Sequence, residues 1–173
     1  MDLRSWGLLL SLSAIWGGSF LFMRVAAPAP GAVPLVALRV SIAAAVLCGF
    51  GLVARRFARP APPWGPLAVL GVLNSALPFV LFAAALRHIP ASLAAPLNAT
   101  TPLFSAAVAA LWLGEPFTLR RVAGLVLGIG GTALLVGAGP VPVTPVTLRA
   151  ATGCLAAAAC YGVSAVYARR WLA

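Results

Sequence analysis

The chain is 173 residues long, 62% of its residues are hydrophobic, only 8% are charged, and its formal net charge is +10. So few charged residues exclude a water-soluble globular domain, which needs a polar surface at this length. The positive charge does not indicate nucleic-acid binding, because the arginines stand at the ends of apolar runs instead of along one polar face. The composition therefore predicts an all-α membrane protein, with the lipid bilayer as its first partner.

Six apolar stretches follow one another along the chain, each near the length of about 20 residues with which a helix crosses the hydrocarbon core. They are residues 5–26, 34–54, 66–86, 92–113, 121–138 and 148–168. Short segments rich in proline, glycine or arginine separate them, as helical hairpins require. These loops leave no room for an aqueous domain, so we expect the function to lie within the bilayer.

The arginines are distributed unevenly over the two sides of the membrane. With a cytoplasmic N-terminus, the inner ones are Arg4, Arg55, Arg56, Arg59, Arg120, Arg121, Arg169 and Arg170, and the outer ones are Arg24, Arg87 and Arg149. Positive charge concentrates in cytoplasmic loops, so both the N-terminus and the C-terminal residues are expected inside. The richness in arginine, alanine, glycine and proline is typical of a GC-rich bacterial genome, which predicts a bacterial inner membrane.

The first three spans carry candidate solute-binding residues. Trp16 and Ser19 lie three positions apart on one helix and combine an aromatic wall with a hydroxyl, although Trp16 can also serve packing alone. Arg39 is the only charge placed well inside a span, where it either holds an anionic group of a solute or extends to the outer headgroups. Asn74 and Ser75 form a polar patch in the third span, one turn before a proline.

The fourth span carries a polar stripe. Asn98, Thr101 and Ser105 are spaced i, i+3 and i+7, which aligns them on one face of a continuous helix, and Pro96 and Pro102 flank the first two. An unpartnered amide is costly in lipid, so this face must line a watery cavity or bond to neighbouring helices. Both interpretations stay open; in the first, carbonyls freed by the prolines add contacts for a solute.

The fifth span and the loop before it carry structural signals. Gly124 and Gly128 form a GxxxG step that predicts a flat packing face. Glu115 is close in sequence to Arg120 and Arg121, which favours an ion pair or loop anchor over a proton relay.

The last span repeats the pattern of the first at a constant offset of 145 positions. Ala14, Gly17, Ser19 and Arg24 align with Ala159, Gly162, Ser164 and Arg169, and Trp16 aligns with Tyr161. Five crossings, an odd number, separate the two copies, so the two helices run in opposite directions. Inverted repeats of this kind are typical of secondary transporters.

An enzyme fits the sequence poorly. The single histidine, His88, is expected in an outer loop, and no nucleophile with a neighbouring base accompanies it. A phosphate-binding loop that ends in lysine is excluded, because all 12 basic residues are arginines. We predict no catalytic site, no cofactor and no metal site.

Two long stretches resemble the EamA-type branch of the drug/metabolite transporter superfamily. The first, residues 16–47, has an aromatic-Gly-x-Ser-Phe motif followed by "LR" at the start of the next span; the second, residues 89–136, has "IPAS", a mid-helix Thr-Pro and "LGE". Residues 4–137 are similar to one five-helix repeat, and residues 149–170 to the first helix of another. The resemblance implies a repeat at 1–139, an outer loop at 140–147 and the beginning of an inverted repeat at 148–173.

The resemblance also implies a function. Members of this family typically have ten helices in two inverted repeats and move metabolites, amino acids or drugs across the cytoplasmic membrane, often outward. We therefore expect a multi-pass transporter, and more specifically an exporter, that acts by alternating access on a small-molecule solute held between the first, third and fourth spans. The expected partners are a missing second half or a second copy of the chain. The alternative is a truncated, non-transporting remnant or assembly partner.

Overall fold

In the computed structural model, which describes residues 2–54, 64–116, 118–137 and 142–172, every regular element is helical. In chain order these are α1 (Leu3–Ala26), α2 (Ala32–Val53), α3 (Trp64–Gly71), the π-helix η2 (Val72–Ala76), α4 (Leu77–Ala85), α5 (Ala91–Asn98), α6 (Thr101–Leu113), α7 (Leu119–Gly137) and α8 (Pro145–Trp171). The predicted all-α fold is confirmed. The predicted loop at 55–63, with three of the inner arginines, and residues 140 and 141 of the predicted outer loop lie outside the described residues.

Five helical stretches in the described part are long and apolar enough to cross a membrane: Leu3–Ala26, Ala32–Val53, Trp64–Ala85, Ala91–Leu113 and Pro145–Trp171. The third joins α3, η2 and α4, and the fourth joins α5 and α6. α7 has 19 residues and occupies the fifth predicted span. Each predicted span thus corresponds to helical structure with similar bounds.

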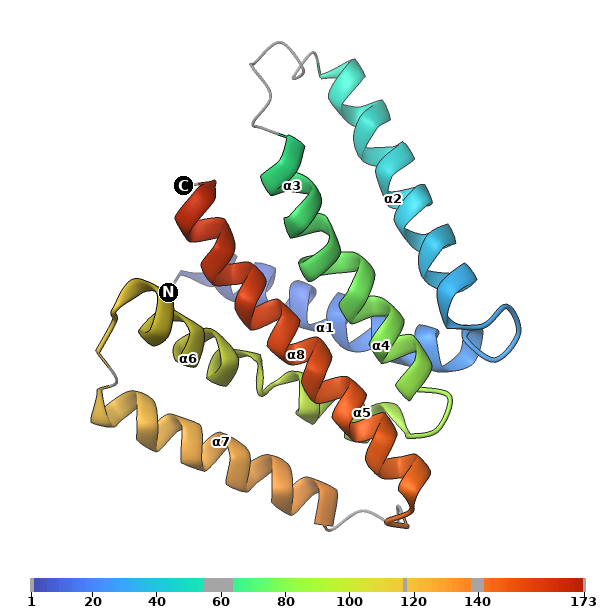
Figure 1. The fold of residues 1–173 in the computed structure, drawn as a ribbon. Coiled ribbons are helices and arrows are strands. Elements are labelled where there is room, and N and C mark those ends of the chain that lie inside the picture. Colours follow the sequence, from blue (N-terminus) through green and yellow to red (C-terminus); the bar gives the residue numbers. More distant parts are fainter. Residues whose placement is uncertain (1, 55–63, 117, 138–141, 173) are drawn as a thin grey trace.

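α8 has the most extensive contacts with other helices. It contacts α4 and α6 most extensively, and also α5, η2 and α3 (Figure 1). Its apolar window is 39% buried, compared with 11% for α1 and 6% for α2. The core accordingly comes from α1, α4, α5 and α8, together with the loop after α4; its largest fully buried side chains include Phe82, Leu86 and Ile89.

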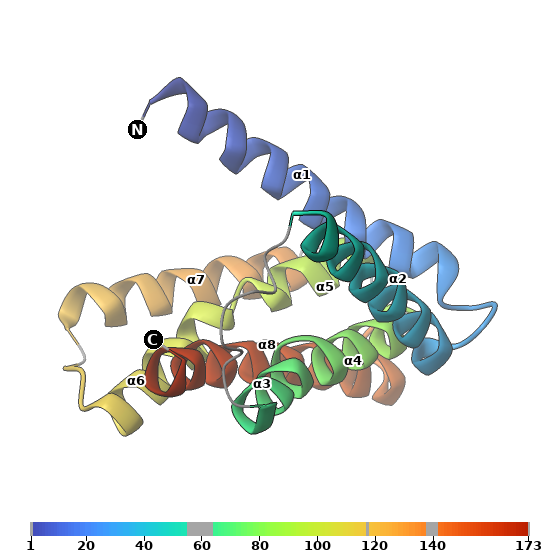
Figure 2. The same ribbon diagram turned by 90° about the horizontal axis from the view of Figure 1, so that it is seen from above.

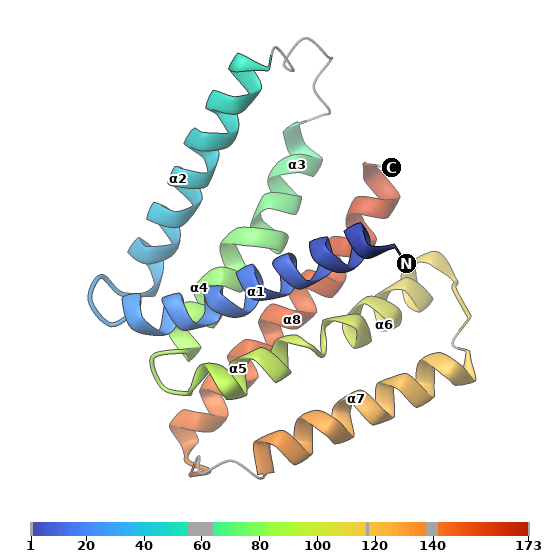
Figure 3. The same ribbon diagram turned by 180° about the vertical axis from the view of Figure 1, so that it is seen from behind.

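α1 and α2 lie to one side of α4 and α8 and expose most of their apolar side chains (Figure 2). α1 contacts α5, and α2 contacts α4 and η2. α1 and α8 run in opposite directions, so that both chain ends lie on the same side of the molecule (Figures 1 and 3). This is the relative direction that an inverted repeat requires.

Arginines of α1 and α8 occupy the carbonyl ends of other helices. Arg24 Nη1 donates to the carbonyl of Leu86, the C-cap of α4, at 2.7 Å, and to the carbonyl of Ile89, in the loop between α4 and α5. Arg170 Nη1 donates to the Trp112 carbonyl, at 3.2 Å, near the end of α6. Cations are favourable at helix C-termini, where backbone carbonyls have no intrahelical partner.

Both carboxylates of the chain lie at helix ends. Asp2 caps α1 by accepting from the Ser5 N–H at 3.0 Å, and also accepts from the Ser5 hydroxyl. The hydroxyl bond, followed by the backbone bond, lowers the pKa of the Asp2 carboxyl from its ordinary value. Glu115 follows α6 and lies 2.6 Å from Arg169 Nη2. The anchor predicted for Glu115 therefore includes a residue of α8 that is far away in the sequence.

The tightest glycine contact lies on α8 and not on the predicted GxxxG face of α7. A Cβ at Gly124 or Gly128 would meet no atom within 4 Å, and both glycines line a cavity together with residues of α6. The flat packing face of α7 stays a prediction. At Gly162 a Cβ would lie 2.6 Å from Phe104 Cβ and 2.7 Å from the Ser105 nitrogen. The backbones of α8 and α6 approach so closely there that only glycine fits.

Candidate functional site

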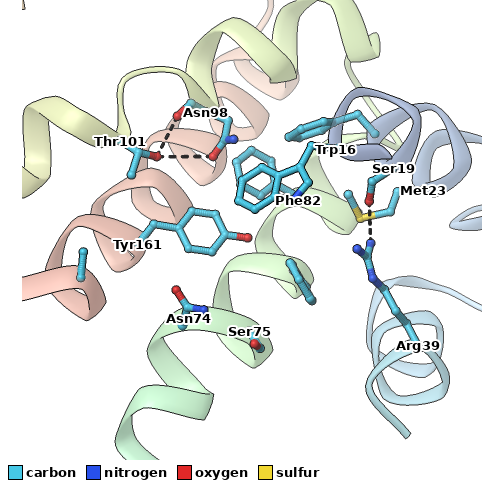
Figure 4. Close-up of a pocket in the computed structure, with 13 residues that line it drawn as sticks. Trp16, Ser19, Met23, Arg39, Asn74, Ser75, Phe82, Asn98, Thr101 and Tyr161 are labelled. Atoms are coloured by element: carbon cyan, nitrogen blue, oxygen red, sulfur yellow. Dashed lines mark hydrogen bonds between the residues drawn. The ribbon is translucent and has the colours of Figure 1, made fainter. Parts of the chain in front are cut away.

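A cavity of about 510 Å³ lies among α1, α2, η2, α4, α5, α6 and α8. Its volume and its mixture of aromatic and polar walls are typical of small-molecule sites. Trp16, Phe82 and Tyr161 form an aromatic wall between two polar regions, one at Arg39 and Ser19 and the other at the start of α6 (Figure 4). Four of the elements that contact α8, namely η2, α4, α5 and α6, also line the cavity.

The structure brings six of the seven sequence-predicted site residues to this cavity. They are Trp16, Ser19, Arg39, Asn74, Asn98 and Thr101. Ser105 lines a separate cavity of about 550 Å³, together with Glu115 and residues of α7. The turn at 99–100 separates Asn98, at the end of α5, from Thr101 and Ser105 on α6, so the three residues do not form one straight stripe. Thr101 lines the first cavity, and Ser105, four residues further along α6, lines the second.

The polar patch of the third span lies on the π-helix η2. Pro78 has no N–H to donate to the Asn74 carbonyl, and its ring crowds that carbonyl in an α-helix. The backbone instead widens just before the proline, with the Leu77 N–H donating to the Val72 carbonyl. Single π-turns occur frequently at functional sites. The side chain of Asn74 accepts a hydrogen bond from Ser164 of α8, at 2.9 Å.

Threonine hydroxyls donate to two backbone carbonyls at the break between α5 and α6. Pro102 cannot donate to the Asn98 carbonyl; the Thr101 hydroxyl donates to it instead, at 2.7 Å. The Thr100 hydroxyl donates to the Leu97 carbonyl, at 2.6 Å. Backbone carbonyls freed by the prolines were expected to contact a solute, but these two carbonyls already accept hydrogen bonds from threonine hydroxyls. The side-chain amide of Asn98 is therefore a polar group that this region offers to the cavity.

Arg39 lies in the cavity wall, half-buried. Its Nη1 donates to the Ser19 hydroxyl at 2.8 Å, and its guanidinium carbon lies 4.4 Å from the centre of the Phe79 ring (Figure 4). A cation over an aromatic face is electrostatically favourable. The hydrogen bond to Ser19 joins α2 to α1.

Sequence reasoning missed Tyr161 and Phe82 as cavity residues. The two rings stack with centroids 6.3 Å apart, and Phe82 also makes an edge contact with Phe20 at 5.2 Å. The signal for Tyr161 was the internal repeat, which aligns it with Trp16; both line the same cavity. No comparable signal marked Phe82, which is one phenylalanine among several in apolar runs.

The repeat also aligns residues with similar contacts. Ser19 and Ser164 are equivalent, and each bonds a polar cavity residue, Arg39 in the first case and Asn74 in the second. Arg24 and Arg169 are equivalent as well, and each reaches the end of a neighbouring span. The aligned serines therefore bond to residues of the cavity wall, and the aligned arginines bond to the ends of neighbouring spans.

The chemistry of the cavity favours binding over catalysis. Its lining offers amides, hydroxyls, aromatic faces and one guanidinium, with no carboxylate, histidine or cysteine among the lining residues. Across the described residues, no group of three or more histidine, cysteine or acidic side chains is placed to hold a metal ion.

Comparison with known proteins agrees with this geometry. The model of the EamA-like transporter family matches residues 4–137. The chain is also 33% identical, over 137 residues, to a probable terminal-alkyne amino-acid exporter of Streptantibioticus cattleyicolor; the match covers 78% of this chain and 45% of that relative. No solved structure gives a significant match. The chain, a multi-pass membrane protein, belongs to the EamA-like transporter family.

Proposed function

We propose that this chain forms the solute-binding part of an exporter of amino acids or similar small metabolites. The observation that carries the proposal is the cavity of about 510 Å³, which has aromatic and polar walls and lies against two interrupted helices. Discontinuous helices with free polar groups are the usual setting for transporter sites. The amino-acid class is taken from the relative, which is named a probable terminal-alkyne amino-acid exporter.

Transport by alternating access needs a second unit that faces the opposite way. In the proposed organisation, residues 1–139 form one repeat, residues 140–147 an outer loop and residues 148–173 the first helix of an inverted repeat. The opposite directions of α1 and α8 and their equivalent contacts support this division. The match covers 45% of the relative's length, and in this proposal the opposing unit is supplied by a second half or a second copy.

The proposed location is a bacterial inner membrane, with the N-terminus and the C-terminal residues in the cytoplasm. The excess of arginines on that side supports it. The pair between Glu115 and Arg169 supports it too, since it joins the end of the fourth span to the end of α8. Cysteine labelling in spheroplasts tests the arrangement: single cysteines at 3 and 172 must react only after the membrane is permeabilised.

The experiment for the function is flux of labelled amino acids from proteoliposomes. Asn98→Leu replaces the cavity amide by an apolar side chain of similar size and is expected to abolish flux, whereas Ser105→Ala, in the neighbouring cavity, retains it. Equal flux in both variants would contradict the assignment of the cavity.

The alternative is a non-transporting assembly partner. The apolar windows of α1 and α2 are only 11% and 6% buried, so these faces meet either lipid or another membrane protein. An amino-acid panel that gives no flux, with a chain that still binds a partner membrane protein stably, would support this alternative over the exporter.

A further inference from the structure

Arg39 carries a charge for which the chain provides no counter-ion. The sequence contains two acidic residues, Asp2 and Glu115. Asp2 is engaged with Ser5 at the start of α1, and Glu115 pairs with Arg169 after α6. Every carboxylate side chain of this sequence is therefore committed elsewhere.

The partners that Arg39 does have leave most of its donors unused. A guanidinium has five N–H donors in a fixed, planar arrangement. Among the described residues, Arg39 donates to the Ser19 hydroxyl and lies over the Phe79 ring. Both partners are neutral, so they orient the guanidinium without neutralising it. An intramembrane charge in this situation usually has a specific partner.

The cavity provides the space for that partner. Arg39 is the only charged residue among those that line it, and its guanidinium points toward Ser19, at the same end of the cavity as Met23 (Figure 4). The amides of Asn74 and Asn98 lie across the cavity and can accept from an ammonium without repelling it. The arrangement thus has a cation on one side and neutral acceptors on the other.

We propose that Arg39 binds the carboxylate of the transported solute. A guanidinium matches the two oxygens of a carboxylate with parallel hydrogen bonds, a geometry that a lysine cannot reproduce. The inference rests on the proposed function and assigns its solute class: a zwitterionic monocarboxylate with an apolar side chain, such as an amino acid, whose side chain lies against Trp16 and Tyr161.

A phospholipid phosphate is the other source of an oxyanion in this setting, so the experiment separates the two. The chain is purified in dodecyl maltoside, which contains no phosphate, and calorimetric titration measures the binding of alanine, leucine, phenylalanine and propargylglycine, each compared with its own amide. The amide keeps the ammonium and the side chain and lacks only the carboxylate. Phosphatidylglycerol is titrated separately.

In the wild type we expect each acid to bind more tightly than its amide. Arg39→Gln should weaken binding of the acids about 10- to 100-fold, as expected for a charge-assisted hydrogen bond, and leave the amides unchanged. Arg39→Lys should bind the acids with an affinity between those of the wild type and Arg39→Gln. Arg87→Gln is the matched control, since Arg87 is exposed in the loop after α4, away from the cavity, and its variant should behave as wild type.

The other outcomes overturn the inference in different ways. If Arg39→Gln keeps the preference for acids over amides, Arg39 does not bind the carboxylate, although the proposed function stands. If phosphatidylglycerol binds in an Arg39-dependent manner while acids and amides bind equally, the guanidinium holds a lipid phosphate. If the wild type binds neither acids nor amides, the proposed function fails together with the inference. Retained amide binding by Arg39→Gln shows that this variant is folded.

Discussion

Replacing Gly162 by alanine should separate α8 from α6. The added Cβ would lie 2.6 Å from Phe104 Cβ, whereas carbon atoms in contact prefer about 3.5–4.0 Å, so the two helices must move apart by about 1 Å. Overpacking of this kind typically lowers the free energy of unfolding by about 1–3 kcal/mol. Because the obstacle includes the backbone nitrogen of Ser105 as well as a side chain, we expect the upper part of that range.

Gly17→Ala is the matched control. Gly17 is equivalent to Gly162 in the repeat and also lies inside a long helix, but a methyl group there meets no atom within 4 Å. Both substitutions gain the same helix propensity, about 1 kcal/mol, so the difference between them isolates the contact. The free energy of unfolding, measured by titrating maltoside micelles with sodium dodecyl sulfate, should be about 2–3 kcal/mol lower for Gly162→Ala than for Gly17→Ala. Equal stabilities would refute the close packing of α8 on α6.

Three further substitutions test individual contacts in the same unfolding assay. Arg24→Gln removes a charged donor from two carbonyls, one at the end of α4 and one in the loop after it, and should cost about 1.5–3 kcal/mol; an unchanged stability would show that water replaces it there. Ser164→Ala removes the donor to Asn74 and should cost about 1 kcal/mol, with the loss absent when Asn74 is already alanine. Glu115→Gln should lower the free energy of unfolding by less than about 1 kcal/mol, because the side chain of its partner Arg169 is 59% exposed. If this loss of stability persisted in 1 M salt, it would contradict an ion pair screened by solvent.

The positions of the helices could be predicted from the sequence with good accuracy. A run of about 20 apolar residues has few alternatives in lipid, because every backbone polar group must be bonded within the segment. Prolines and glycines then mark the ends; Gly31 and Gly114, for example, have positive φ angles at the start of α2 and the end of α6. The interruptions at Pro78 and Pro102 were also visible as local sequence signals.

The neighbours of each helix could not be predicted in the same way. All the spans are apolar, so hydrophobicity does not distinguish a face that meets lipid from one that meets protein. Gly124 and Gly162 illustrate this: a Cβ added at Gly124, in the GxxxG step of α7, would meet no atom within 4 Å, whereas a Cβ at Gly162, an isolated glycine on α8, would lie 2.6 Å from Phe104 Cβ. Ser105 is a related case: it follows Thr101 by four residues on α6 but lines the neighbouring cavity, which the spacing of polar residues along one helix does not reveal.

The central position of α8 has a consequence for biosynthesis. The ribosome makes the chain from its N-terminus, so α8 enters the bilayer after all the helices that pack on it. Until it arrives, Asn74 has no serine partner, and the sides of α4 and α6 that it will cover face lipid or the insertion machinery. The earlier helices are therefore inserted as a loose group, and they pack together only after translation has passed residues 145–171.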